Sequence, residues 1–431
     1  IRSHRPFMNI CMMTNTYLPH VGGVARSVST FAEEFRRRRH GVLVVAPTFE
    51  GKPPSSRQEA YVERVAAIQN FNGSDFSVCL PLAAALSDRL DQFKADIIHA
   101  HHPFLLGATA LRVGASKNVP VVFTHHTRYE DYTHYVPFDS PALREVAINL
   151  STQFANLCDG VIAPSESIAD LIKSRGVESP VRVVPTGIDV KAFARGDGES
   201  FRKKMKIPQN AFVVGHVGRL APEKNLKYLA EAMVAFAKKA PATRVLVVGA
   251  GPAEDSVVAA FARHGLTDRL HIAGKLSGRT LANAYHAMDV FAFASMSETQ
   301  GLVLAEAMAA GLPVVALDAP GVREVLINDS NGFMLPAKTS TRRFATMIER
   351  IHAEPQRLKA FSEKAQQTAE TFSRESCAKQ ALEFYAEVRQ QTLRHREAIE
   401  QTPWGTLVER IGMEWKLLTH RAEALVNAVV V

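Results

Sequence analysis

The sequence predicts an α/β protein built from two doubly wound domains. Short apolar segments that suit strands alternate with amphipathic segments that suit helices along most of the chain. Strands interleaved with helices of this length form parallel sheets. The chain has 431 residues, which is long for one hydrophobic core, so two domains are the natural expectation.

The first series of elements predicts an N-terminal domain over residues 8–190. Its expected strands are residues 8–13, 42–47, 97–100, 119–124, 160–163 and 181–184. Between the first two strands, apolar residues recur at helical spacing on one face, at Val24, Val28, Phe31 and Phe35. The same alternation of strand and helix continues through this half of the chain.

A second series predicts another domain of similar size over residues 211–370. Its expected strands are residues 212–217, 244–248, 270–273, 290–294 and 314–317. Between the two series, residues 191–210 are rich in Lys, Arg, Gly and Asp, and we interpret them as the interdomain linker. Ligands of such folds bind beyond the carboxyl ends of the strands, so we expect a site in a cleft between the two sheets.

Residues 371–431 read as helical and are expected to pack back on the N-terminal domain. A first helix is predicted from Ser373 to about Glu400, and Pro403 separates it from a last helix that starts near Thr406. The alternative for the last helix is a contact with a membrane surface. Its charges balance, whereas such anchors usually carry a cationic face, and this favours packing.

Composition indicates a soluble globular protein, with 46% apolar and 22% charged residues. Four scattered Cys without a C-x-x-C pair favour a reducing compartment and argue against zinc or a disulfide framework. No apolar run reaches the roughly 20 residues that a spanning helix needs, and residues 1–7 do not resemble a signal peptide. A cytoplasmic location is therefore expected.

The net charge of +8 is concentrated near the start of the chain, where Arg36–Arg39 form a run of four. Cations at the end of a helix are favoured by the helix dipole. A basic face that meets an anionic membrane is an equally good interpretation. Nucleic acid is not expected as a partner, because no repeat of aromatic and basic residues accompanies the run.

The most informative segment follows the strand at 290–294. Glu298 lies in the loop after this strand, a helix starts near Gly301, and Glu306 lies further along it. A helix N-terminus offers free N–H groups and a positive dipole end to phosphates. Carboxylates accept hydrogen bonds from sugar hydroxyls, so the pattern predicts a nucleotide-sugar site. The alternative is a plain strand–helix connection with two solvated glutamates.

Two cations follow the first strand of the second domain, Arg219 and Lys224. A diphosphate leaving group needs its developing charge neutralised, and fixed cations do this without a metal. Arg binds phosphate in a fork and Lys acts as a point charge. Surface cations in a loop are the alternative for either residue alone. The sequence has no Asp-x-Asp pair, so no metal and no cofactor are expected.

Glycine pairs also follow strands. Gly22 and Gly23 precede the first helix and permit close approach of the backbone to a bound group, with a simple turn as the alternative. Gly249 and Gly251 form a weak G-x-G, because Glu254 stands where the dinucleotide fingerprint needs its last glycine.

Histidines are dense at two strand ends of the first domain, at His99, His101, His102, His125 and His126. Their spacing fits no familiar zinc site and no Cys joins them. Of the five, His126 is best placed for contact with a sugar or an acceptor. A structural, hydrogen-bonded role remains a fair alternative for His99 and His101.

From about Met8 to Tyr385, the sequence resembles the retaining GT-B glycosyltransferases of the large group 1 family. The resemblance rests on the Gly22-Gly23 loop, on residues 218–225 and, most specifically, on the pair Glu298 and Glu306, which matches the family's E-x7-E. It implies transfer of a hexose from a nucleotide sugar with retention, without metal or cofactor.

The resemblance also implies roles for individual residues. Glu306 would hold the ribose, and Glu298 the hydroxyls of the donor sugar. His126, Arg219, Lys224 and Glu298 would form the catalytic group, with the two cations on the leaving diphosphate. The other residues implied in donor binding are Gly22, Gly23, Gly249, Gly251, Lys275, Leu276, Gly301, Leu302 and Val303, with Lys275 and Leu276 near the base.

For the acceptor, residues 123–132 and 298–301 look like diacylglycerol glycosyltransferases. This implies a peripheral enzyme at the inner face of a membrane that adds a hexose such as glucose to a lipid, with His102, Tyr129 and Asp131 in acceptor binding. The sequence departs from that pattern at His125, where a tyrosine or similar residue is usual. Gln300 favours the resemblance to diacylglycerol glycosyltransferases, because many other relatives have phenylalanine at this position.

Other interpretations stay open at this point. The acceptor can be a soluble or polyprenyl-linked saccharide in cell-envelope polysaccharide synthesis. In another class, the fold suits a nucleotide-dependent dehydrogenase or a non-catalytic binding protein. The incomplete glycine fingerprint argues against the dehydrogenase, and the intact set of Arg219, Lys224, Glu298 and Glu306 argues against a binding protein without activity.

Overall fold

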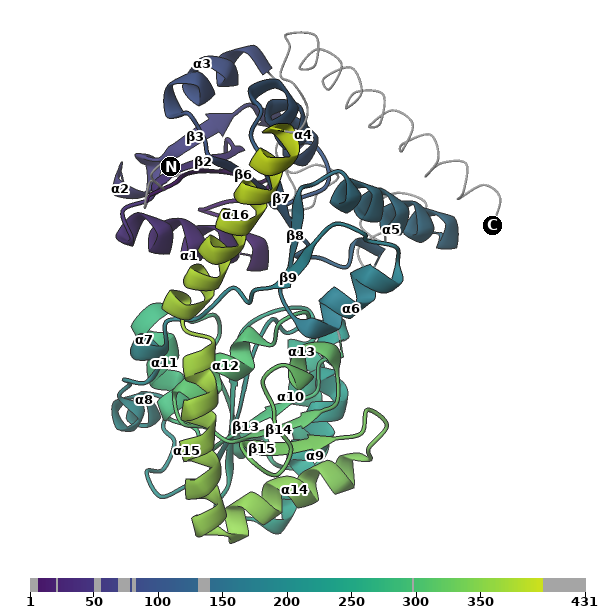
Figure 1. Ribbon diagram of the computed structural model, residues 1–431. Coiled ribbons are helices and arrows are strands. Elements are labelled where there is room, and N and C mark those ends of the chain that lie inside the picture. Colours follow the sequence, from purple (N-terminus) through teal and green to yellow (C-terminus); the bar gives the residue numbers. More distant parts are fainter. Residues whose placement is uncertain are drawn as a thin grey trace. The chain divides into compact units, whose positions relative to one another are not determined.

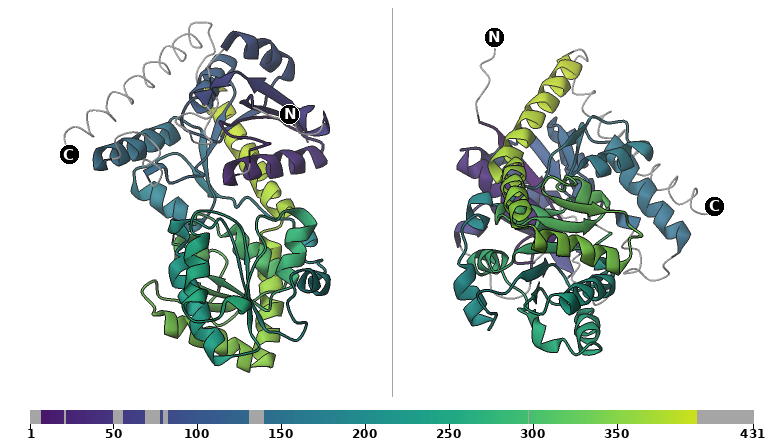
Figure 2. Two further views of the ribbon diagram at one scale, coloured as in Figure 1. Left: turned by 180° about the vertical axis from the view of Figure 1, so that it is seen from behind. Right: turned by 90° about the horizontal axis from the view of Figure 1, so that it is seen from below.

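The computed structural model describes residues 7–20, 22–49, 56–68, 78–79, 83–130, 140–296 and 298–397. The chain forms two compact units (Figure 1). Unit 1 comprises Ile1–Thr186 and Cys377–Val431, and unit 2 comprises Gly187–Ser376. Each unit has a parallel sheet with helices on both faces (Figures 1 and 2), which confirms the predicted α/β class.

Unit 1 contains a seven-stranded sheet in the order β3-β2-β1-β6-β7-β8-β9. Its strands are β1 (Asn9–Met13), β2 (Gly41–Pro47), β3 (Val62–Val65), β6 (Ile97–Ala100), β7 (Val121–Thr124), β8 (Gly160–Ala163) and β9 (Val181–Val183). Its helices are α1 (Gly23–Arg37), α2 (Ser56–Glu59), α3 (Ala83–Phe93), α4 (Leu106–Lys117), α5 (Pro141–Asn156) and α6 (Glu166–Ser174). A small antiparallel ribbon pairs β4 (Ala67–Ile68) with β5 (Val78–Cys79).

Unit 2 contains a six-stranded sheet in the order β12-β11-β10-β13-β14-β15. Its strands are β10 (Val213–Val217), β11 (Arg244–Val248), β12 (Leu270–Ile272), β13 (Val290–Phe293), β14 (Val314–Leu317) and β15 (Gly332–Leu335). Its longer helices are α9 (Leu226–Lys239), α10 (Glu254–Ala262), α11 (Gly278–His286), α12 (Leu302–Ala309), α14 (Thr341–Ala353) and α15 (Pro355–Thr371). Short helices are α7 (Val190–Phe193), α8 (Gly198–Lys204), η3 (Pro222–Lys224), η4 (Thr267–Arg269) and α13 (Pro320–Arg323).

Alternate residues of the unit 2 strands enter two separate hydrophobic clusters. In β13, Phe291 and Phe293 belong to one cluster, whereas Val290 and Ala292 belong to the other. Successive strand side chains point to opposite faces of a sheet, so each cluster is the core on one face. Burial on both faces explains why these strands read as continuous apolar runs.

The segment predicted as a linker, residues 191–210, instead contains α8 and most of α7, and both helices lie in unit 2. Phe193 and Phe201 are buried in its core. The guanidinium of Arg202 donates to the carbonyls of Ala287, Gln209 and Ala211 and to the carboxylate of Asp289, over 2.8 to 3.0 Å. The boundary between the units therefore falls before this charged segment, at Thr186 and Gly187.

Two stretches of chain run between the units, and within unit 2 they are bonded to each other. Ile188 N donates to the Phe372 carbonyl over 2.7 Å, and Arg374 N donates to the Ile188 carbonyl over 3.0 Å. The Arg374 guanidinium also pairs with the carboxylate of Asp189. The start of unit 2 is thus fixed beside its end.

Helix α16 (Arg374–Glu397) starts at this point and packs against the core of unit 1. Phe384 and Val388 lie against Gly160 of β8, where a Cβ would come within 2.8 and 2.9 Å of their side chains. The Tyr385 hydroxyl lies 2.6 Å from His99 Nδ1. Residues 398–431, which include the predicted last helix, lie outside the described residues.

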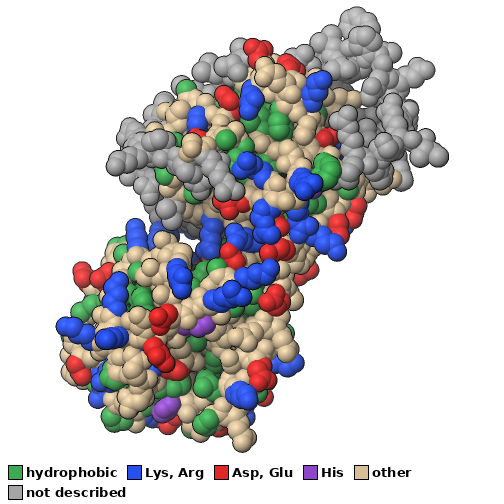
Figure 3. Space-filling view, turned by 90° about the vertical axis from the view of Figure 1, so that its left-hand side faces the viewer, with side chains coloured by type: hydrophobic (Ala, Val, Ile, Leu, Met, Phe, Trp, Pro, Cys, Tyr) green, Lys and Arg blue, Asp and Glu red, His purple; other side chains and the backbone are tan. Residues whose placement is uncertain are grey.

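Most of the arginine run at the end of α1 has partners within unit 1. Arg37 and Arg38 bond to the buried carboxylate of Glu34 over 2.9 and 3.1 Å. The Arg36 guanidinium stacks on Tyr61, 4.1 Å from the ring centre. These contacts support the helix-end interpretation of the run. The face of the molecule in Figure 3, on the side of α1, nevertheless carries many Lys and Arg side chains.

No helix in the described part of the chain is long and apolar enough to cross a membrane.

The bond between Tyr385 and His99 makes a testable contribution to stability. Tyr385→Phe leaves the buried His99 Nδ1 without a partner, so we expect the free energy of unfolding to fall by about 1 to 3 kcal/mol. Urea unfolding followed by circular dichroism measures the change. The matched control is Tyr129→Phe, because the buried Tyr129 hydroxyl has no hydrogen-bond partner among the described residues. Equal losses of unfolding free energy in the two variants would show that the bond between Tyr385 and His99 does not stabilise the fold.

Candidate active site

The predicted donor residues of unit 2 lie in loops at one edge of its sheet. They follow β10, β11, β12 and β13, in the segments 218–225, 249–251, 274–276 and 298–306. These strands are parallel, so their carboxyl ends meet at the same edge. The topology therefore gathers groups that are far apart in the sequence.

Gly301 forms the sharp turn that starts α12. Its φ of 65° lies in the left-handed region, and a Cβ there would lie 2.2 Å from the Gly321 carbonyl oxygen. Gly321 in turn donates its N–H to the Glu298 carbonyl over 3.1 Å. The loop that carries Glu298 is thus held against the start of α13. The N–H groups of Gly301, Leu302 and Val303 lie in the turn that opens α12, where the sequence predicted phosphate binding.

Glu298 forms an ion pair with Lys224. Lys224 Nζ lies 2.6 Å from Glu298 Oε1, and the two side chains are only 18% and 21% exposed. Asn225, next to Lys224, donates its side-chain amide to the Ala294 carbonyl over 3.3 Å and so ties the loop after β10 to the end of β13. The structure therefore brings together two of the predicted catalytic residues.

Glu306 is almost fully buried, with 1% of its surface exposed. The Tyr285 hydroxyl of α11 donates to Glu306 Oε2 over 2.8 Å. Burying a carboxylate costs free energy of folding unless it accepts hydrogen bonds. The bond from Tyr285 therefore helps Glu306 to remain buried. The alternative of a solvated surface glutamate is wrong for Glu306. Tyr285 is a site residue that the sequence analysis missed.

Arg219 is about half exposed and pairs with Glu223, four residues further along. It follows β10 directly, at the same sheet edge as Lys224. Lys275 is exposed, and Leu276 packs partly against the core of unit 2.

Gly249 and Gly251 have a packing role. Their φ angles are 141° and 154°, and a Cβ would come within 1.9 Å of the Gly218 oxygen and 2.4 Å of the Leu220 oxygen. The loop after β11 is therefore pressed against the backbone of the loop after β10. These glycines set the position of the segment that carries Arg219.

In unit 1, the predicted residues also follow strand ends. Gly22 precedes α1, and a Cβ there would lie 3.0 Å from His20 Nε2, whereas a Cβ on Gly23 would meet nothing within 4 Å. The backbone at Gly23 is thus open to approach. Asp131 lies outside the described residues.

The five histidines at the ends of β6 and β7 are all buried. Burial lowers the pKa of His99 and His102 to about 3 and that of His125 to about 4. Burial, with nearby histidines as a smaller cause, holds the pKa of His101 and His126 well below the usual range. All five rings are therefore neutral at pH 7.

Hydrogen bonds hold most of these rings. His99 Nε2 lies 2.6 Å from Thr124 Oγ1, as the structural, hydrogen-bonded alternative for His99 expects. His101 Nδ1 lies 2.9 Å from His126 Nε2. His102 Nδ1 accepts the Asn15 N–H over 3.1 Å. No group of three or more His, Cys, Asp or Glu in the described part of the chain is arranged to hold a metal ion.

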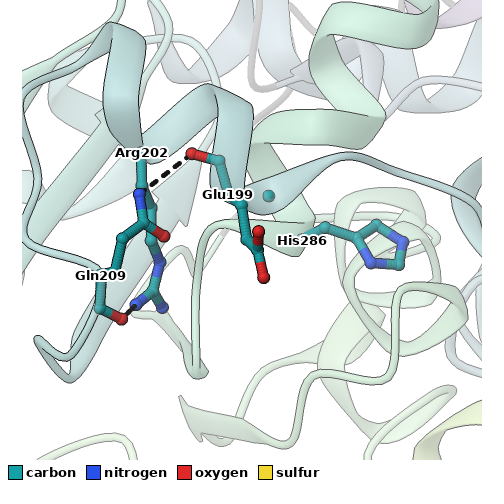
Figure 4. A pocket seen from close by; sticks show the side chains of 5 residues that line it. Glu199, Arg202, Gln209 and His286 are labelled. Carbon is teal, nitrogen blue, oxygen red and sulfur yellow. Dashed lines mark hydrogen bonds between the residues drawn. The ribbon is translucent and has the colours of Figure 1, made fainter.

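A separate cavity of about 310 Å³ in unit 2 is lined by Gly198, Glu199, Arg202, Gln209 and His286 (Figure 4). Gln209 accepts from Arg202 through its carbonyl and donates to the Glu199 carbonyl through its side-chain amide. His286 is bonded to the Phe193 carbonyl over 2.8 Å. The polar groups here hold α8 in place, and none of the predicted site residues lines this cavity.

Comparison with known proteins identifies the family. The model of Glycosyltransferase Family 4 matches residues 21–192, and that of Glycosyl transferases group 1 matches residues 197–368. The "Alpha-monoglucosyldiacylglycerol synthase" of Streptococcus pneumoniae is 30% identical over 331 residues, which cover 74% of this chain and 73% of that protein. The chain is a group 1 glycosyltransferase.

Two further relatives of this glycosyltransferase are similar over most of their length. The "Alpha-monoglucosyldiacylglycerol synthase" of Acholeplasma laidlawii is 27% identical over 88% of this chain and 97% of that protein. The crystal structure of Anabaena Alr3699/HepE in complex with UDP and glucose matches with a TM-score of 0.67 and 25% identity, over 88% of this chain and 100% of that chain. The GT-B fold expected from the sequence is confirmed.

Tyr285 provides a test of the Glu306 environment in this glycosyltransferase. Tyr285→Phe removes one donor to Glu306 Oε2, so the carboxylate is held less firmly. We expect the dissociation constant for UDP, measured by titration calorimetry, to rise by about three- to tenfold. Tyr228→Phe is the matched control, since the buried Tyr228 hydroxyl has no hydrogen-bond partner among the described residues. Unchanged UDP affinity in Tyr285→Phe would show that Tyr285 does not position Glu306.

Proposed function

We propose that this glycosyltransferase moves a hexose from a nucleotide sugar, UDP-glucose in the first instance, to diacylglycerol or a similar membrane lipid. The reaction retains the configuration of the anomeric carbon and uses no metal. The observation that carries the proposal is the arrangement of Lys224, Glu298 and buried Glu306 around the start of α12.

The donor assignment follows from the chemistry of this edge. A nucleotide sugar has a diphosphate between two sugars that carry hydroxyls. The diphosphate suits the N-terminus of α12 together with Lys224 and Arg219. Carboxylates suit the hydroxyls, with Glu306 on the ribose and Glu298 on the hexose. UDP and glucose are the ligands named for the Anabaena structure.

Donor binding involves an exchange of partners. In the structure, Lys224 and Glu298 neutralise each other, and both are largely withdrawn from water. When the donor enters, Lys224 turns to the phosphates and Glu298 to hydroxyls of the hexose. Lys224, Arg219 and the helix dipole then face the charge that grows on the leaving diphosphate, which lowers the barrier. This charge stabilisation replaces the metal ion that other diphosphate-releasing enzymes use.

Retention and the lipid acceptor are supported by the relatives. The two synthases are named for an α-glucosyl product on diacylglycerol, and UDP-glucose itself is an α-glycoside, so an α product means retention. Arg26, Arg36, Arg37 and Arg39 are exposed on or next to α1. Each cation near an anionic membrane surface contributes about 1 kcal/mol of attraction, so unit 1 suits a peripheral enzyme on the inner leaflet.

Donor and acceptor can be identified in one transfer experiment. The protein is incubated with radiolabelled UDP-, GDP- or ADP-hexoses and vesicles that contain diacylglycerol, and the chloroform phase is counted. We expect label in the lipid from UDP-glucose, an α-anomeric product by NMR, and no loss of activity in EDTA. Label that enters only soluble or polyprenyl-linked saccharides would refute the lipid acceptor while keeping the glycosyltransferase.

The roles of Glu306 and Arg219 predict different kinetic defects. Glu306→Ala removes a contact made before and during reaction, so the donor dissociation constant should rise by about ten- to a hundredfold. Arg219→Ala removes charge stabilisation that grows in the transition state, so kcat should fall by about a hundredfold with a smaller effect on donor affinity. Steady-state kinetics and calorimetry separate the two.

Lys239→Ala is the control for this pair, because Lys239 is a half-exposed surface cation of unit 2 paired with Glu349. It should keep wild-type kinetics. Wild-type kinetics in Glu306→Ala and Arg219→Ala as well would refute the site assignment.

A further inference from the structure

Two strand ends of unit 1 bring two imidazole rings into a buried hydrogen bond. His101 follows β6, His126 follows β7, and His101 Nδ1 lies 2.9 Å from His126 Nε2. The rings are stacked, with centres 5.2 Å apart and planes inclined by 20°. Between two neutral imidazoles, one nitrogen must donate and the other must accept.

The surroundings of His101 decide the direction of this bond. His101 is fully buried, and its Nε2 has no hydrogen-bond partner among the described residues. A proton on Nε2 would be a buried donor without an acceptor, which proteins avoid more strictly than a lone pair without a donor. His101 therefore carries its proton on Nδ1 and donates to His126.

This direction fixes the tautomer of His126. Its Nε2 accepts from His101, so a neutral His126 must carry its proton on Nδ1. The burial that holds the pKa of His126 well below the usual range keeps the ring neutral. His126 is 7% exposed, whereas His101 is 0% exposed, so of the two only His126 can touch a ligand.

We propose that His101 is a positioning residue that holds His126 as the Nδ1–H tautomer, so that His126 donates a hydrogen bond to a hydroxyl oxygen of the transferred hexose. The inference rests on the proposed function, because it needs a transferred hexose, and it takes His126 as the sugar contact that the sequence indicated. His101 itself acts only through His126.

The neighbouring rings support this assignment. His99 packs on His101 with ring centres 4.0 Å apart, and it is held by Thr124 and Tyr385 over 2.6 Å on each side. His99 can therefore keep the plane of His101 fixed. His102, also 7% exposed, accepts at Nδ1 and so carries its proton on Nε2. His102 and His126, the two rings of this cluster that are 7% exposed, thus each keep one N–H that can donate to a sugar oxygen.

The tautomer can be read without any substrate. In protein with ¹⁵N-labelled histidine, long-range ¹H–¹⁵N correlation NMR separates the two tautomers, and His126→Gln assigns the signals. We expect a protonated Nδ1 on His126, which is the minor tautomer of free histidine. His101→Phe keeps a ring of similar size but cannot donate, so this pattern should be lost. His101→Asn can place an amide N–H near the position of Nδ1 and should restore it.

Kinetics supply the second measurement. His101→Phe should lower kcat/KM for the donor by about tenfold, the scale of one hydrogen bond, and His101→Asn should recover most of it. A His126 protonated on Nε2 in the wild type, or a tautomer that does not change in His101→Phe, would overturn the inference. If His101→Phe does not fold, the wild-type spectrum still decides. A changed tautomer with unchanged transfer would instead refute the contact between His126 and the hexose.

Discussion

The pairing of β10 with β13 is the contact on which the candidate donor site depends. The two strands are adjacent in the sheet but far apart in the sequence, and their register sets the distance between the loops that follow them. Lys224 comes from one loop and Glu298 from the other, and their 2.6 Å ion pair is possible only with this register. A one-residue slip would turn Phe291 and Phe293 of β13 toward the cluster that now contains Val290 and Ala292, so the packing on both faces opposes it.

The two units present different chemistry at their strand ends. The strand ends of unit 2 carry charged groups, in which cations are paired with carboxylates. The cations suit a diphosphate, and the carboxylates suit sugar hydroxyls. Unit 1 gathers imidazoles that burial keeps neutral, so its polar groups act as uncharged donors and acceptors. The strand ends of unit 2 therefore suit a charged ligand, and those of unit 1 suit an uncharged one.

The sequence predicted much of this architecture, and its failures have physical causes. Buried parallel strands such as 160–163 read as apolar runs, and their positions agree with the structure. The edge strand β3, with the sequence Val-Glu-Arg-Val, is only half buried and lacks such a run. The linker was misplaced because composition alone does not show that the charged residues of α7 and α8 form salt bridges or that their phenylalanines are buried. Tyr285 was missed because a tyrosine on the apolar face of a helix looks like core until its hydroxyl is located.

The division of unit 1 between the two ends of the chain has a consequence for biosynthesis. Unit 2 is one continuous stretch, Gly187–Ser376, whereas the core of unit 1 includes α16, which follows it. As the chain leaves the ribosome, unit 2 can finish folding first, while the β8 face that will receive Phe384 and Val388 stays uncovered. The nascent N-terminal half must therefore remain soluble, with the apolar surface around Gly160 uncovered, until α16 has been made.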